Sequence, residues 1–149
     1  MMPAGSRATR GAVYVEFMIA VVPLFMVFWG LMQLNGFLVA DLVTRHAAVN
    51  AVRAAIVCDS DEKTKGESGA VECATEAAKM TTKAVQSIET TTVTVRGASE
   101  SGNAPVIAQV SATYHCQVPL MARVVCGGSD SRVIVREATL PNQGHYYKF

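Results

Sequence analysis

Glu16 is the residue of this chain whose position most calls for a chemical explanation. It stands five positions after Gly11, near the start of a long apolar run, and a short basic leader containing Arg7 and Arg10 precedes it. An acid at the middle of a membrane-spanning helix costs about 2.5–3.5 kcal/mol, and such residues usually serve a function. Because Glu16 lies near the start of the run, its carboxylate either reaches the membrane interface or pairs with a positive group within the membrane.

The histidines are the next candidates for chemistry, and their positions argue against catalysis. His46, His115 and His145 lie in different predicted elements, and they form no Ser–His–acid set. No glycine-rich phosphate loop follows a strand. We interpret His115, next to Cys116, as a strand-face histidine beside a disulfide, and His46 as a surface or interface residue. The sequence therefore predicts a protein that is not an enzyme and holds no cofactor or metal.

The four cysteines predict an oxidising compartment. All of them lie after the apolar run, and their number is even, which is typical of disulfides outside the cytosol. Four cysteines allow three pairings. We favour Cys58–Cys73 and Cys116–Cys126 because these residues are neighbours in sequence, and each bridge would contribute about 2–3 kcal/mol.

The apolar run itself predicts a membrane-spanning helix over residues 12–40. About 20 residues cross a bilayer, and a secretory signal has an apolar core of only about 7–15 residues, so this run is long for a signal. Signal removal after Ala40 is disfavoured because Leu38 is bulky. Basic residues flank both ends of the run, so the positive-inside rule favours a cytoplasmic N-terminus only weakly. The cysteines place the C-terminal part outside.

Helical periodicity continues beyond the apolar run through residues 41–57. Large apolar residues recur at steps of three and four, or multiples of these, and polar residues fall between them. The apolar positions are Leu38, Leu42, Val49, Val52 and Ile56. We expect one helix from about Ala12 to Val57, about 70 Å long, whose second half packs on a globular domain.

Residues 58–149 are predicted to form that domain, with an α+β fold. An amphipathic helix is expected over residues 70–88. Period-two alternation then predicts strands at residues 91–96, 106–118 and 132–140, joined into an antiparallel sheet with one wet face. A long helix laid on a small three-stranded antiparallel sheet is an α+β arrangement.

Composition excludes some classes of partner. The chain has 149 residues and a formal net charge of +1; 50% of its residues are hydrophobic and 17% are charged. A nearly neutral chain gives no reason to expect nucleic acid as a partner, and no residue set indicates a small-molecule substrate.

Three stretches of residues 7–57 form a recognisable pattern: RATRGAVYVEFMIAVVPLF, with its G-x-x-x-x-E-F spacing and following proline, then GLMQL and HAAVNAVRAAIV. In these stretches the chain resembles the TadE/TadG-like pseudopilins of tight-adherence (Flp) pilus systems. This resemblance implies a pilin-like fold and a basic prepilin-type leader over residues 1–11. A prepilin peptidase would cut between Gly11 and Ala12, and Glu16 and Phe17 would serve recognition and assembly.

By this resemblance, the chain would be a minor pilin-like structural subunit needed for assembly of a pilus or related secretion machine. Its partners would be the membrane, the prepilin peptidase, other pilin or pseudopilin subunits and the assembly platform. It would cross the bacterial inner membrane once, with a periplasmic C-terminal domain, and could enter a surface pilus. The alternative is an unprocessed single-span protein that presents a periplasmic binding domain. A membrane-anchored enzyme lacks a supporting residue set.

Overall fold

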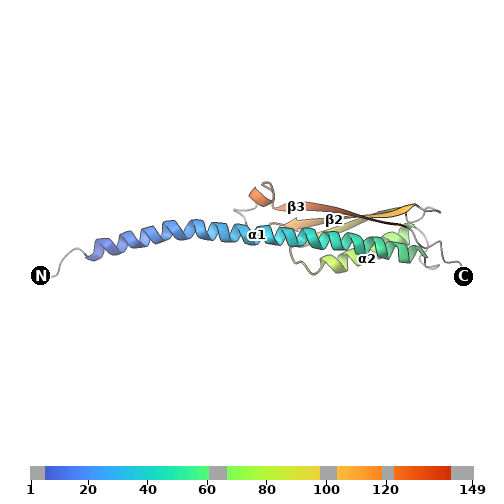
Figure 1. Cartoon of the computed structure of the whole chain (residues 1–149), viewed down its shortest axis with the longest axis horizontal. Coiled ribbons are helices and arrows are strands. Elements are labelled where there is room, and N and C mark those ends of the chain that lie inside the picture. Colours follow the sequence, from blue (N-terminus) through green and yellow to red (C-terminus); the bar gives the residue numbers. More distant parts are fainter. Residues whose placement is uncertain (1–5, 61–66, 98–103, 119–122, 142–149) are drawn as a thin grey trace.

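One long helix carries a small two-layer domain at its C-terminal end (Figure 1). The computed structural model describes residues 6–60, 67–97, 104–118 and 123–141; within helices, it leaves the side chains of residues 6–12, 59, 60 and 67 undescribed. In chain order the elements are α1 (Ser6–Ser60), α2 (Glu67–Thr82), β1 (Ile88–Arg96), β2 (Pro105–His115) and β3 (Ser131–Pro141). The predicted α+β class, with a second helix and a three-stranded antiparallel sheet, is confirmed.

The sheet packs both helices on one of its faces. Its strand order is β1-β2-β3, and both neighbouring pairs are antiparallel. α1 lies against β2 and β3, while α2 lies against β1 and alongside α1. The central strand shows the expected alternation, since every second residue from Val106 to Tyr114 is buried. The opposite face, rich in threonine, is exposed or half-buried.

The second helix ends earlier than expected. Prediction extended it to Ile88, but α2 stops at Thr82. Two tight turns follow, in which Val85 N–H donates to Thr82 O and Ile88 N–H donates to Val85 O. Ile88 instead opens β1, opposite Tyr114 of β2. Threonines and valines follow Ile88, and β-branched residues favour the paired strand over further helix.

The central strand is also shorter than predicted, because it ends at His115 rather than Val118. Beyond it, the Cys116 N–H donates to Asp130 O at 2.8 Å. This bond closes the connection to β3, and β3 extends one residue further at each end than the predicted 132–140.

The helix face that contacts the domain differs from the predicted stripe. Leu38, Leu42 and Val49 are exposed, whereas Val52 is buried and Ile56 packs at the edge of the core. The residues of α1 that are fully buried are mostly alanines: Ala40, Ala47, Ala48, Ala51 and Ala55. Small side chains let helix axes approach one another closely. Hydropathy ranks leucine above alanine, so the predicted stripe included the exposed Leu38 and Leu42 and left out the buried alanines.

The core is accordingly built from small side chains. Alanines 70, 74 and 78 of α2 face those of α1, and valines from β1 and β2 complete the cluster. The largest fully buried side chains are Val52, Val106, Val110 and Thr44. Such a core buries little apolar area per residue, so covalent support matters more. The structure forms both expected disulfides, Cys58–Cys73 and Cys116–Cys126.

Candidate functional site

Residues 13–32 of α1 are not covered by the domain, and this part of the helix is called the bare segment. From residue 13 to residue 32 almost every side chain is exposed, among them Leu24, Phe25 and Trp29, and the first buried residue is Gln33. In Figure 1 this part of α1 extends alone beyond the domain. About 20 residues rise about 30 Å, the thickness of the hydrocarbon core of a bilayer. The helix is long and apolar enough to cross a membrane.

The bare segment is shorter than the span expected over residues 12–40. From Gln33 on, one side of α1 contacts the sheet, so the apolar run serves two environments. Over residues 33–40, one side of the helix packs against the domain, and the other side, with Leu38 and Val39, is exposed.

The predicted processing and assembly residues all lie on this bare end of α1. Gly11 and Ala12 are part of the helical backbone, and their surroundings lie outside the described side chains. Glu16 and Phe17 are exposed. Among the side chains that the structure describes, none forms an ion pair or hydrogen bond with Glu16. The helix thus presents a single carboxylate on an apolar surface.

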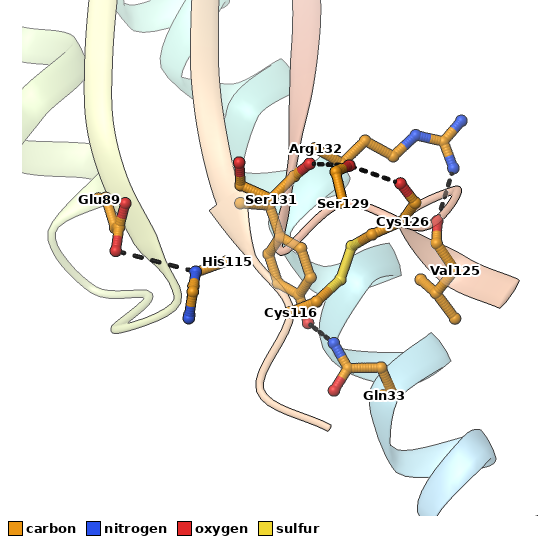
Figure 2. The surroundings of a disulfide bond; sticks show 10 residues. Gln33, Glu89, His115, Cys116, Val125, Cys126, Ser129, Ser131 and Arg132 are labelled. Carbon is orange, nitrogen blue, oxygen red and sulfur yellow. Dashed lines mark hydrogen bonds and ion pairs between the residues drawn. A yellow bond between two sulfur atoms is a disulfide. The ribbon is translucent and has the colours of Figure 1, made fainter. Parts of the chain in front are cut away.

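A buried hydrogen bond marks the point where the bare segment ends. Gln33 Nε2 donates to the Tyr114 hydroxyl at 3.0 Å, and both residues are buried. Figure 2 shows Gln33 reaching from α1 toward β2. Burial raises the pKa of Tyr114 above its usual value of 10.0, because the phenolate would lose its hydration. Because both groups are buried away from water, this hydrogen bond supplies the polar partner that each of them needs.

Gly36, almost one helical turn after Gln33, also lies close to the Tyr114 hydroxyl, and a glycine leaves room for that hydroxyl. A Cβ placed on Gly36 would lie 3.0 Å from the Tyr114 hydroxyl oxygen. One residue further, the ring of Phe37 meets Tyr114 edge-on, with centroids 5.7 Å apart and an interplanar angle of 80°. The guanidinium carbon of Arg132, on β3, lies over the Phe37 ring, 5.0 Å from its centroid, a cation–π geometry.

An ion pair forms the third contact of this junction. Asp41 Oδ1 binds Arg136 Nη2 of β3 at 2.5 Å, and its other oxygen accepts from Arg45 Nε at 3.2 Å. Gln33, Phe37 and Asp41 follow at intervals of four residues, so they share one face of α1. Together they lock α1 onto β2 and β3, and the orientation of the domain is fixed relative to the bare helix.

The sequence prediction missed this junction. It placed Gln33 inside the span expected over residues 12–40 and Asp41 at the start of the continuation over residues 41–57, and it gave neither residue a contact. The four-residue spacing of Gln33, Phe37 and Asp41 is the signal that could have identified a contact face. Their partners Tyr114 and Arg136 belong to strands, and only the register of the sheet brings them to that face.

The second disulfide holds the connection between β2 and β3 at the same end of the domain. Figure 2 shows the Cys116–Cys126 bridge beside the junction. The Ser129 Oγ lies 2.9 Å from Cys126 O and 2.8 Å from Ser131 O, so its single hydrogen can be donated to either carbonyl, and Arg132 Nη1 donates to Val125 O at 2.9 Å. These bonds order the turn that leads into β3.

The histidines take no part in a common site within the described residues. His115 is exposed beside the disulfide, with Nδ1 3.9 Å from Glu89 Oε1. His46 is exposed on α1, and His145 lies outside the described residues. No group of three or more His, Cys, Asp or Glu side chains within the described ranges is placed to hold a metal ion.

Comparison with known proteins returned no relative: neither the family models, nor the curated proteins, nor the solved structures contain a match to this chain.

Proposed function

We propose that the protein is a membrane-anchored, pilin-like structural subunit of the TadE-like pseudopilin type. One observation carries the proposal: a single continuous helix is bare and apolar over residues 13–32 and forms the core of a domain over the remainder. The locked junction of Gln33 with Tyr114 and of Asp41 with Arg136 joins the two parts stiffly. A stiff helix lets neighbouring subunits pack their helices in the membrane and present their domains in a fixed array.

The proposed topology follows from the positions of the charges and the disulfides. The leader with Arg7 and Arg10 stays in the cytoplasm, and the domain with both disulfides lies in the periplasm, where such bridges persist. A prepilin peptidase cuts after Gly11 and leaves Ala12 as the first residue. The subunit serves a tight-adherence pilus or a related secretion machine.

Glu16 acts as a docking charge in this proposal. Cleavage creates a positive amine at Ala12, and the amine of one subunit pairs with Glu16 of its neighbour. A charge pair in a low-dielectric surrounding favours register more than net stability. Glu16 is exposed on the bare helix, so a neighbour can reach it.

The exposed stripe of Leu38, Leu42 and Val49 extends the same contact surface above the membrane. These side chains lie on α1 away from the domain core. Apolar side chains on one line with the bare segment suit packing against a neighbouring helix.

The docking role is tested by Glu16→Gln, with Glu16→Asp as the matched control, in bacteria that carry the assembly machinery. Glu16→Gln keeps the size and hydrogen-bonding capacity of the side chain but removes its charge. We expect both variants to be inserted and processed, while only Glu16→Gln loses cross-linked multimers and surface assembly. Normal assembly of Glu16→Gln would contradict the pairing role.

A further inference from the structure

The sheet ends in a free edge along β1. His115 N–H donates to Ser87 O at 2.8 Å, so the odd-numbered residues of β2 direct their N–H and C=O groups toward β1. From Thr90 to Arg96 the register with β2 is unbroken, and the even-numbered residues of β1 lie opposite those odd-numbered residues. The backbone groups of β1 that point away from the sheet therefore belong to three outward residues: Thr91, Val93 and Val95. Within the part of the chain that the structure describes, no backbone hydrogen bond beyond the β1–β2 ladder involves them.

The helix layer is wider than the sheet that it covers. Three strands spaced about 4.8 Å apart make a sheet about 14 Å wide, whereas two helices side by side, each with a diameter of about 10 Å, need about 20 Å. α1 lies against β2 and β3, and α2 lies against β1. The excess width of the helix layer therefore falls on the β1 side, where α2 extends beyond the edge of the sheet. The difference is about the width of one further strand.

A shallow cleft of about 500 Å³ lies at this position, between the end of α2 and the first half of β1. The Thr82 and Thr91 hydroxyl oxygens lie 2.9 Å apart and join its two walls. An extended segment in this cleft would bond to the free backbone of β1 and would be covered by the end of α2. The lining residues are Lys79, Thr82, Lys83 and residues 88–92.

The charges at the cleft favour an acidic occupant. Lys79 and Lys83 are exposed, and among the described side chains neither forms an ion pair. Glu89 is the acid of the cleft, and its Oε1 lies 3.9 Å from Nδ1 of His115. The two lysines therefore leave the cleft with an excess of positive charge, which attracts carboxylates and repels basic segments.

We propose that β1 accepts a fourth strand from a partner protein, and that this strand is an extended acidic segment. Main-chain hydrogen bonds to the three outward residues supply affinity, and the side chains at alternate positions supply specificity. One face of the added strand lies under α2, so its carboxylates lie beside Lys79 and Lys83. The contact is made by the domain alone and is therefore independent of processing after Gly11.

A second copy of the chain is a poor donor of this strand when its helices lie on the same side of the sheet. Its β1 carries α2, and its β3 carries α1. Either edge strand would bring a helix to the place that α2 already occupies. A segment without a helix layer of its own meets no such obstacle.

The test combines peptide binding with hydrogen exchange, on the full-length protein in detergent micelles. The probe is a synthetic peptide of nine residues, the length of β1, in which glutamate and valine alternate. One control peptide alternates lysine and valine, and a second is the acidic peptide methylated at every backbone nitrogen. Fluorescence polarisation measures affinity, and nuclear magnetic resonance follows exchange of the three outward amides.

The acidic peptide is expected to bind and to slow exchange of all three outward amides, whereas neither control peptide does so. Lys79→Gln combined with Lys83→Gln should weaken binding about fivefold, since each exposed charge pair contributes modestly. Arg53→Gln, which removes an exposed charge on α1, should leave binding unchanged. Circular dichroism checks the fold of both variants.

Three results would overturn the proposed strand: no binding of the acidic peptide, equal binding of the basic peptide, or binding that leaves the outward amides unprotected. Protection of those amides that rises with protein concentration, without any peptide, would identify a second copy as the donor and would equally overturn the acidic partner. None of these results bears on the membrane anchor or on cleavage after Gly11.

Discussion

The two halves of α1 differ in the size of the side chains that face outward and inward. Over residues 13–32 the helix exposes valine, leucine, methionine, phenylalanine and tryptophan on all sides. Over residues 33–58 most of its fully buried side chains are alanine or threonine, with Val52 among them, whereas Leu38, Leu42 and Val49 are exposed. One uninterrupted helix therefore has a part that no other element covers and a part whose covered face is built mainly from small side chains.

This difference shows what each half requires. In the proposed membrane setting, lipid chains would adapt to any side chain, so the bare half could carry large residues without a fixed partner. The covered half meets α2 and the sheet at close range, where protein interiors are densely packed and extra atoms have no room.

The largest expected effect comes from enlarging an inward alanine. Ala51 is fully buried in the core, so Ala51→Leu should destabilise the domain by about 2–3 kcal/mol through overpacking. Ala20→Leu makes the same change on the bare half, where Ala20 is exposed, and should leave the stability of the domain unchanged. Urea unfolding in detergent micelles, followed by circular dichroism, measures both; equal effects would refute the contrast.

An intermediate effect is expected at the junction ion pair. Arg136→Met removes the partner of Asp41, whose side chain is only 15% exposed, and should cost about 1–2 kcal/mol. Arg45→Met removes the other partner of the same carboxylate, but Arg45 is 62% exposed, and the cost should be below about 0.5 kcal/mol. Thermal unfolding of the two variants compares them. A larger loss of stability for Arg45→Met than for Arg136→Met would show that the Asp41–Arg136 ion pair is not what holds α1 against β3.

A small effect is expected at the close contact of Gly36 with Tyr114. Glycine costs about 1 kcal/mol relative to alanine in a helix interior, but the added methyl group would press on the Tyr114 hydroxyl. Gly36→Ala should therefore stabilise the protein more in a Tyr114→Phe background than in the native one. A double-mutant cycle measures this coupling, and additive effects would contradict the contact.

The pKa of Tyr114 supplies an independent check of the same contact. Burial raises its folded-state pKa above 10.0, so the related stability is present below pH 10 and is lost as the pH rises through the folded-state pKa. Tyr114→Phe should reduce this alkaline loss of stability.

Sequence patterns predicted the elements better than their contacts. The alternation from Val106 to Tyr114 identified the central strand, and proximity in sequence identified both disulfides. The inward face of α1 was predicted only in part: Val52 and Ile56 pack on the core, but Leu38 and Leu42 are exposed, because they carry more hydropathy than the buried Ala47 and Ala51. Periodicity alone cannot tell a face that packs on the chain's own sheet from one that is left for other partners.

Of the candidate site, the sequence identified Glu16 but not the junction between α1 and the sheet. Glu16 was identified from the sequence because a carboxylate is conspicuous in an apolar run, and its proposed role stays a prediction. The junction was not identified, because Gln33 and Tyr114 are distant in the chain and their contact depends on how α1 crosses the sheet. Long-range polar contacts of this kind require the strand register and the helix rotation together.

The most direct test of the account is the N-terminus of the native protein. Mass spectrometry of the chain isolated from bacteria that carry the prepilin peptidase should find a first residue of Ala12. That result would place Glu16 within reach of a neighbour's new amine and support an assembling subunit. An intact bond between Gly11 and Ala12 in those cells would contradict the account and favour an unprocessed single-span protein.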